Sequence, residues 1–245
     1  MQKILGYIFT PIFYLYFGFF CYLFQPIQWL CYNVGGYNPH RIAVNMLNFF
    51  LNPALRIMGY SLSVRGRANV PDGKPIIFVA NHQSMYDIPT LIWHLRRYHM
   101  KFIAKKELGL GLASITYNLR KGGSALIDRS DPRQSITEIA RLGAKLEKNC
   151  HSVLLFPEGT RAKDGIMKPF KSGGLKTLIQ NMPSAVVVPI AIRGSWKVMQ
   201  HSGFPIPFGG QIVWQILPAI DPKNFKTVDE LMHYTEQQVK QKINY

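Results

Sequence analysis

The sequence is poor in acidic residues and in cysteine. Only 13 of its 245 residues are Asp or Glu, against 29 Lys and Arg, which gives a formal net charge of +16 at pH 7. A positive excess of this size predicts an anionic partner, either nucleic acid, a membrane surface or an acidic substrate. The three cysteines, Cys21, Cys31 and Cys150, form no Cys-x-x-Cys pair and no Cys/His cluster. The cysteine pattern therefore suggests neither a disulfide framework nor a zinc site, and it favours a reducing compartment.

Charge is missing altogether from residues 4–24, a run dense in Phe, Tyr, Leu and Ile. About 20 apolar residues are enough to span a bilayer, although the aromatic density also suits an interfacial or re-entrant position. Pro26 and Gly35-Gly36 follow this run, and a second, amphipathic segment comes after them at residues 42–58. We predict a two-helix membrane-docking segment over residues 1–59. The alternative is that both helices belong to the soluble core.

Beyond Gly59 the pattern alternates between short apolar strands and helices. Asp131-Pro132 is a strong helix start, with an N-cap residue followed by proline at N1. Thr227 and Glu230 form a capping box for a C-terminal helix. The alternation predicts one α/β domain over residues 60–245, with a mostly parallel central sheet flanked by helices on both faces. The strands are expected at residues 62–65, 76–80, 101–104, 125–127, 153–156, 186–192 and 212–217.

The chemical centre of the sequence is the stretch Asn81-His82-Gln83-Ser84-Met85-Tyr86-Asp87, which follows the buried strand expected at 76–80. Within one continuous helix His82 and Asp87 would lie about 140° apart. They can meet only if His82 precedes the helix and Asp87 lies in its first turn, and Pro89 favours a helix start there. A carboxylate that touches an imidazole fixes its tautomer and makes it a general base. The alternative is that Asp87 only caps a helix and His82 is an ordinary loop residue.

A second cluster, Phe156-Pro157-Glu158-Gly159-Thr160-Arg161, also follows an expected strand. Parallel strands end on one edge of a sheet, so this corner can lie beside His82. Arg161 offers a planar fork suited to phosphate, Glu158 can hold that arginine or bind a substrate hydroxyl, and Gly159 allows close approach of the backbone. Lys105 and Arg129, at two other expected strand ends, could point at the same pocket. The alternative for each basic residue alone is a solvated surface charge.

Four ordered motifs carry a resemblance to a known family: NHQSMYD, AKKEL with the later LIDR, FPEGTR, and VVPIAIRG. Together they resemble the blocks of the lysophosphatidic acid acyltransferase family (1-acyl-sn-glycerol-3-phosphate O-acyltransferase). The resemblance implies that His82 is the catalytic base, that Asp87 is its partner, and that Pro189 lies on the acyl-donor side. It further implies that the acceptor is bound by Lys105, Arg129, Glu158, Gly159, Thr160 and Arg161.

The activity implied is transfer of a fatty acyl group from acyl-CoA or acyl carrier protein to the sn-2 hydroxyl of lysophosphatidic acid, which gives phosphatidic acid. We expect direct transfer with His82 as the base, and an oxyanion held by a backbone N–H of the His82 corner or by Lys105. We expect no cofactor and no metal. The expected partners are lysophosphatidic acid, the acyl donor and membrane lipids. We expect the chain to be membrane-associated, with its active site at the cytoplasmic face.

Other functions explain fewer of these features. Nucleic-acid binding would use the positive charge, but it leaves the apolar N-terminus unexplained, and no helix-turn-helix, RNP or zinc signature is present; we expect no nucleic acid partner. A non-catalytic basic protein of the membrane surface would bind anionic lipid without needing a histidine–aspartate corner. Among acyltransferases, the alternative acceptors are glycerol 3-phosphate and other lysophospholipids.

Overall fold

Seven strands form one sheet in the order β1-β7-β6-β2-β5-β3-β4 in the computed structural model, which describes residues 2–111 and 113–243. The five strands from β6 to β4 run parallel, whereas β7 is antiparallel to β6 and pairs in parallel with β1. The predicted mostly parallel sheet is therefore confirmed, and all seven expected strands are present. Their bounds are β1 Tyr60–Arg65, β2 Ile76–Ala80, β3 Lys101–Lys105, β4 Ala125–Ile127, β5 Val153–Leu155, β6 Val186–Arg193 and β7 Gly210–Ile216.

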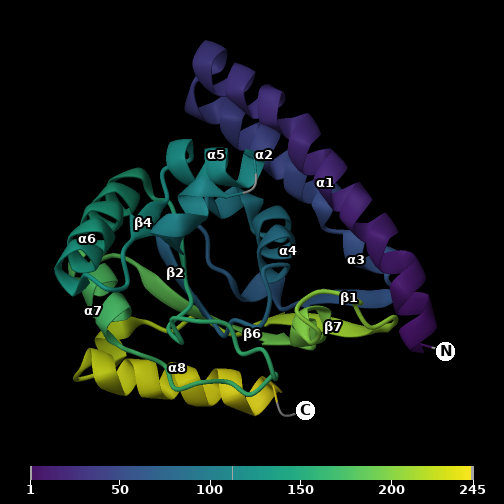
Figure 1. Cartoon of the computed structure of the whole chain (residues 1–245). Helices are drawn as coiled ribbons and strands as arrows, with labels where there is room; N and C mark the ends of the chain where they lie inside the picture. Colours follow the sequence, from purple (N-terminus) through teal and green to yellow (C-terminus); the bar gives the residue numbers. More distant parts are fainter. Residues whose placement is uncertain (1, 112, 244–245) are drawn as a thin grey trace.

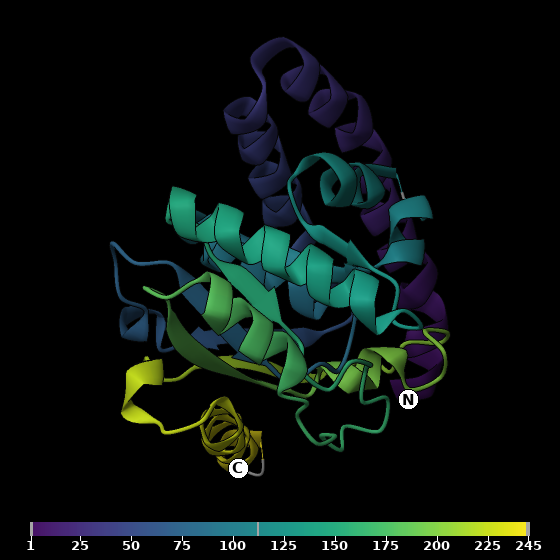
Figure 2. The ribbon, with the colours of Figure 1, turned by 90° about the vertical axis from the view of Figure 1, so that its left-hand side faces the viewer.

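Helices cover both faces of the sheet, as Figures 1 and 2 show. One face is covered by α1 Gln2–Gly35, α2 Tyr37–Leu51, α3 Ala54–Ile57, α4 Asp87–His94 and α5 Ala113–Lys121. The other face is covered by α6 Pro132–Asn149, α7 Gly173–Asn181 and α8 Val228–Ile243. Short 3-10 turns join these elements: η1 Arg67–Asn69, η2 Arg96–Tyr98, η3 Lys106–Leu110, η4 Ser195–Met199 and η5 Pro222–Asn224.

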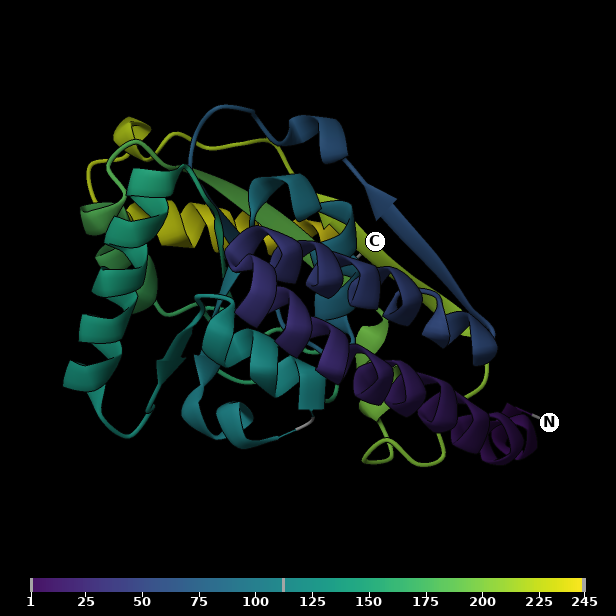
Figure 3. The ribbon, with the colours of Figure 1, turned by 90° about the horizontal axis from the view of Figure 1, so that it is seen from above.

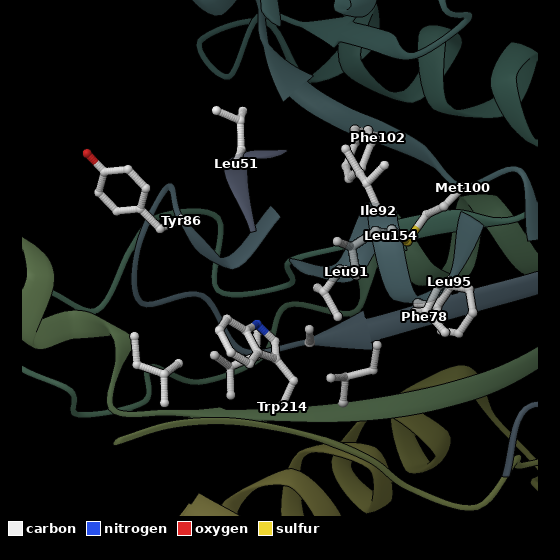
Figure 4. Packing of buried hydrophobic residues seen from close by; sticks show 14 of the residues in the cluster. Leu51, Phe78, Tyr86, Leu91, Ile92, Leu95, Met100, Phe102, Leu154 and Trp214 are labelled. Atoms are coloured by element: carbon white, nitrogen blue, oxygen red, sulfur yellow. The ribbon is translucent and has the colours of Figure 1, made fainter. Parts of the chain in front are cut away.

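The central strand β2 shows how the sequence divides the core into two layers. Side chains alternate between the faces of a strand, so Ile76 and Phe78 pack toward α1, α2 and α4, whereas Ile77 and Val79 pack toward α6, α7 and α8. All five residues of β2 are buried, which explains why the strand is a continuous apolar run rather than an alternating one. Figure 4 shows the first layer, where Trp214 lies below Leu91 of α4 and Phe78 lies to the right of Leu91.

Local capping chemistry sets the helix starts that the sequence predicts. Asp131 accepts a hydrogen bond from the backbone N–H of Gln134 at 3.0 Å, with Pro132 at the first helical position of α6. Near the start of α8, the Thr227 hydroxyl accepts from the N–H of Glu230 at 3.2 Å. Both predicted helix starts are confirmed.

The N-terminal helices extend beyond the apolar runs seen in the sequence. The first helix continues through Pro11 and Pro26 to Gly35, and Gly36, with φ of 74°, turns the chain into α2. A proline removes one backbone donor, but here the turns on either side of Pro26 are held by packing, since Phe24 and Gln28 are buried. The second helix ends at Leu51, and Ala54–Ile57 form the separate short helix α3. Figure 3 shows α1 and α2 lying side by side across the sheet.

The long helix α1 has two different faces. Phe13, Phe17, Cys21 and Phe24 belong to the buried core, and the rings of Phe13 and Phe17 lie 5.2 and 5.4 Å from the Tyr86 ring. The opposite face exposes large apolar side chains along its whole length, among them Ile8, Leu15, Phe19, Tyr22, Trp29, Leu30 and Val34. Within the described residues α1 is the one helix that is long and apolar enough to cross a membrane.

The exposed apolar face of α1 supports membrane association. The buried face of α1 belongs to the core that contains Tyr86. The first 59 residues therefore share a core with the rest of the chain. The division into an anchoring segment, 1–59, and a catalytic domain, 60–245, stays a prediction.

Candidate active site

The predicted site residues lie at one edge of the sheet. The corner with His82 follows β2, the corner with Glu158 and Arg161 follows β5, Lys105 ends β3, and Arg129 follows β4. These four strands are neighbours in the order β2-β5-β3-β4 and run parallel, so their carboxyl ends meet on the same side. In open α/β sheets this edge is where ligands bind.

His82 and Asp87 form the pair that the corner geometry predicts. His82 precedes α4 and Asp87 is its first residue, and the imidazole Nδ1 lies 3.1 Å from Oδ2 of Asp87. The Asp87 side chain is wholly buried, and the same Oδ2 accepts hydrogen bonds from the backbone N–H groups of Gln83 and Ser84, each at 2.9 Å. Because a carboxylate only accepts, the Nδ1 proton points at Asp87, which leaves Nε2 to act on a substrate.

Two further contacts, which were not predicted from the sequence, hold the His82–Asp87 pair. The Phe156 ring stacks on the His82 ring with 4.0 Å between centroids and an interplanar angle of 18°. Ser195 follows β6 and donates its hydroxyl to Oδ1 of Asp87 at 2.5 Å. Each oxygen of the carboxylate is therefore engaged. The fourth motif ends immediately before Ser195, and that adjacency was the signal available in the sequence.

The Glu158 side chain makes different contacts from those expected. The sequence suggested that it could hold Arg161 or bind a substrate hydroxyl. Instead, the side chain is buried, Oε1 accepts from the backbone N–H of His82 at 2.6 Å, and Oε2 accepts from that of Lys168 at 2.8 Å. Burial raises the pKa of Glu158, and these two N–H donors oppose the rise. Glu158 thus ties the β5 corner to the peptide that carries His82.

The loop after Glu158 folds directly onto the His82 corner. The N–H of Ala162 donates to the carbonyl of His82 at 2.8 Å. This bond places the preceding residue, Arg161, near the His82–Asp87 pair. Gly159 has φ of 72°, a left-handed conformation that favours glycine in this turn, and no protein atom lies within 4 Å of where a Cβ would stand. Thr160 is exposed at the surface of the loop.

Arg161 and Arg129 lie close enough for their charges to interact. Burial lowers the pKa of Arg129, Glu107 opposes this, and the positive charge of Arg161 lowers it further. Burial also raises the pKa of the neighbouring Tyr86 phenol, and the charge of Arg161 acts in the opposite direction. Two guanidinium groups that approach each other beside a base form a natural site for an anion with several oxygens.

Lys105 lies at the same edge but is more exposed. Its Nζ forms an ion pair with Glu107 at 3.0 Å, in which both side chains are about half exposed. Such a surface pair contributes little to stability, so the ammonium can exchange Glu107 for a substrate. The acceptor-binding roles of Lys105, Arg129 and the 158–161 loop stay predictions.

Three backbone N–H groups at the His82 corner are engaged within the protein. The N–H of His82 donates to Glu158, and the N–H groups of Gln83 and Ser84 donate to Asp87. The oxyanion role expected of a backbone N–H at this corner or of Lys105 stays a prediction. Pro189 lies buried inside β6 and pairs with Val79, next to the carboxyl end of β2, and its place on the acyl-donor side stays a prediction. Over residues 2–111 and 113–243, no cluster of three His, Cys, Asp or Glu side chains could hold a metal ion.

Comparison with known proteins places this geometry in a family. The acyltransferase family model matches residues 61–193, which include both corners and most of the sheet. The 1-acyl-sn-glycerol-3-phosphate acyltransferase BAT2, chloroplastic, of Brassica napus is 36% identical over 141 residues, covering 57% of this chain and 39% of that protein. A 1-acyl-sn-glycerol-3-phosphate acyltransferase of Chlamydomonas reinhardtii is 32% identical over 200 residues, covering 81% of this chain and 58% of that protein. The chain thus spans less than two thirds of the length of these two curated relatives.

A solved structure is similar along the whole chain. The 1-acyl-sn-glycerophosphate (LPA) acyltransferase PlsC from Thermotoga maritima superposes with a TM-score of 0.78 and is 26% identical. The match covers 100% of this chain and 97% of that structure. It therefore includes α1 and α2 as well as the sheet, and it confirms the resemblance carried by the four motifs. This chain belongs to the acyltransferase family, and within it resembles the lysophosphatidic acid acyltransferases.

Proposed function

We propose that this chain transfers a fatty acyl group from an acyl thioester to the sn-2 hydroxyl of 1-acyl-sn-glycerol 3-phosphate, giving phosphatidic acid. The observation that carries the proposal is the His82–Asp87 pair, 3.1 Å apart, on the sheet edge that also presents Arg129 and Arg161. A base and an anion-binding group side by side suit an acceptor that has both a hydroxyl and a phosphate. The names of the relatives support the same substrate.

The chemistry needs no nucleophile from the protein. Nε2 of His82 accepts the proton of the acceptor hydroxyl as its oxygen attacks the thioester carbonyl, and Asp87 stabilises the imidazolium that forms. Collapse of the tetrahedral intermediate expels the thiolate, which takes the proton back from His82. The serine hydroxyls nearest the pair are engaged as hydrogen-bond partners: Ser195 donates to Asp87 and Ser84 accepts from the N–H of Tyr86. Direct transfer is therefore favoured over a covalent acyl-enzyme.

The positive groups at the edge position the acceptor. In this proposal Arg161 and Arg129 bind the phosphate, and Lys105 either joins them or stabilises the oxyanion. The acyl donor is acyl-CoA or acyl carrier protein, both of which carry negative charge that complements the basic surface. The apolar outer face of α1 lies in a membrane, with the catalytic edge at the cytoplasmic side.

The experiment is acyl transfer by purified protein in detergent, with lysophosphatidic acid, glycerol 3-phosphate and lysophosphatidylcholine as acceptors. Oleoyl-CoA and an oleoyl acyl carrier protein serve as donors. We expect phosphatidic acid from lysophosphatidic acid, and its loss in His82→Ala, while His233→Ala, an exposed histidine of α8, behaves as wild type. If only another acceptor is turned over, the proposed substrate changes and the proposed mechanism stays. Near-normal turnover by His82→Ala would overturn the mechanism.

A further inference from the structure

A cluster of positive and aromatic side chains lies at the sheet edge opposite the active site. His99 and Lys101 stand at the amino end of β3, and His151 stands just before β5, whereas the active site uses the carboxyl ends of these strands. The length of β3 separates the two edges by about 13 Å. Tyr37 and Arg41, in the first turns of α2, complete the cluster.

The cluster is closely packed. The rings of His99 and His151 stack with 4.4 Å between centroids, and the Tyr37 hydroxyl lies 3.3 Å from Nδ1 of His99. Nζ of Lys101 lies 4.5 Å from the centre of the Tyr37 ring. Lys145 of α6 reaches the same place, because a Cβ built on Gly123 would lie 3.7 Å from its Nζ and 3.9 Å from Cε of Lys101.

The charges in this cluster are all of one sign. The charged groups that act on Lys101 are Lys145 and Arg41, and those that act on His151 are His99, Lys101, Arg41 and Lys145. Burial, followed by these cations, lowers the pKa of Lys101 to about 7. Among the described residues, none of the ion pairs involves Arg41, Lys101 or Lys145. Such a concentration of like charge is costly without an anion.

Two buried groups in the cluster lack partners. His40 is 1% exposed and lines the recess, and its Nε2 has no hydrogen-bond partner. Nε of Arg41 is likewise buried and unpartnered. Both residues lie in the first turns of α2, a 15-residue helix whose N-terminus has no capping side chain and no acidic residue. Helix N-termini attract anions through free N–H groups and the helix dipole.

We propose that this recess, lined by Tyr37, His40, Arg41, His99 and Lys101, binds a phosphate group at a site separate from the active site. Its free volume of about 30 Å³ has room for about two oxygen-sized groups, so two phosphate oxygens enter while the rest of the ligand stays at the mouth. A guanidinium and a helix N-terminus from α2, together with an ammonium from β3, suit an anion with several oxygens. The phosphate comes either from an anionic lipid headgroup or from a soluble compound.

The test uses the full chain in detergent with Arg161→Ala as the background, so that the candidate active site contributes less to phosphate binding. In this background we compare Arg41→Gln/Lys101→Met with Arg65→Gln/Lys223→Met, which removes the same charges from exposed positions elsewhere. Calorimetry with inorganic phosphate reports soluble ligand. Flotation with phosphatidylcholine vesicles, with and without phosphatidic acid, reports the headgroup.

We expect the Arg41/Lys101 variant to bind at least about tenfold more weakly than its matched control, because two charge-assisted contacts are lost. Weaker binding of inorganic phosphate would identify a soluble source, and weaker binding confined to phosphatidic acid vesicles would identify a lipid headgroup. Equal binding by both variants in both assays would overturn the proposal. Should the double variant fail to fold, Lys145→Met, an exposed change on α6, must still weaken binding. These outcomes do not depend on acyl transfer.

Discussion

The hydroxyl of Ser195 donates a hydrogen bond to Oδ1 of Asp87, although 108 residues separate the two in sequence. It joins the corner after β6 to the corner after β2, while the other carboxylate oxygen faces His82. The amide oxygen of Gln83 lies 3.4 Å from the same hydroxyl. The orientation of the His82–Asp87 pair therefore depends on a residue outside the NHQSMYD stretch.

Replacement of Ser195 by alanine should reduce kcat and leave the acceptor KM nearly unchanged. Loss of a hydrogen bond to a charged acceptor costs about 1.5–3 kcal/mol, so we expect a fall of about tenfold or more. The pH–rate profile should change as well, because Asp87 then stabilises the imidazolium less well. Steady-state kinetics over a range of pH measure both effects.

Thr235→Val is the control for Ser195→Ala. Thr235 is buried in α8 and donates its hydroxyl to the carbonyl of Leu231 at 2.7 Å, on the far face of the sheet. Its loss should lower stability without changing the pH–rate profile. If the two variants show the same profile, Ser195 has only a structural role.

Replacement of Arg161 by alanine should raise the acceptor KM by about 10- to 100-fold, with a smaller effect on kcat, because one or two charge-assisted hydrogen bonds to phosphate are lost. Lys163→Ala is the matched control, since Lys163 is an exposed cation two residues away. Kinetics at constant ionic strength separate a specific contact from general attraction. A similar KM for both variants would contradict a phosphate-binding role for Arg161.

The sequence predicts those features that depend on neighbouring residues. The strands follow from apolar runs, the starts of α6 and α8 follow from their caps, and the approach of His82 to Asp87 follows from a corner of six residues. Each of these depends on local backbone geometry and hydrogen bonding, which the order of residues largely sets. The shared edge follows from the parallel sheet, because parallel strands end on the same side.

The features that the sequence did not reveal depend on distant contacts. Glu158 reaches the peptide of His82 across 76 residues, and its two N–H donors can be identified only from the fold. The continuation of α1 to Gly35 could not be read from the sequence, because proline disfavours a helix interior on local grounds, whereas packing of Phe24 and Gln28 holds the helix together around Pro26. The recess around Lys101 is lined by side chains from four separate segments of the chain. In the sequence, each basic residue among them resembles an ordinary surface charge.

His40 should make the protein sensitive to acid. Burial, followed by the charge of Lys101, lowers its pKa to about 4, whereas an exposed histidine has a pKa of about 6.5. Between these values the unfolded chain binds a proton that the folded chain does not, so the free energy of unfolding falls as pH falls. A shift from 6.5 to about 4 corresponds to about 3 kcal/mol at most.

His40→Phe removes this titration and keeps an aromatic ring between Tyr32 and Tyr117, whose ring centroids lie 5.5 and 5.7 Å from that of His40. Urea unfolding in detergent should show a smaller loss of stability on going from neutral pH to about pH 4 in the variant than in the wild type. His233→Gln, on the exposed face of α8, should leave the loss as in the wild type. An equal loss in all three proteins would contradict a role for His40.

Gly194 immediately precedes Ser195, whose hydroxyl donates to Asp87. Its replacement by alanine should lower the stability of the fold. Its φ is 88°, and a Cβ would lie 2.2 Å from the carbonyl oxygen of Gln211 on β7. The left-handed conformation alone costs a side chain about 1–2 kcal/mol, and the contact with backbone adds to this. We expect Gly194→Ala to lower the free energy of unfolding by more than about 2 kcal/mol and to lower kcat, because Ser195 moves with it.

Gly173→Ala at the start of α7 is the matched control for Gly194→Ala. No atom lies within 4 Å of its added Cβ, so its effect on the free energy of unfolding should stay within about 1 kcal/mol. If Gly194→Ala lowers stability but keeps the wild-type kcat, the loop after β6 adjusts independently of Ser195. If both variants unfold alike, Gln211 can move aside, and the close contact does not fix the position of the serine.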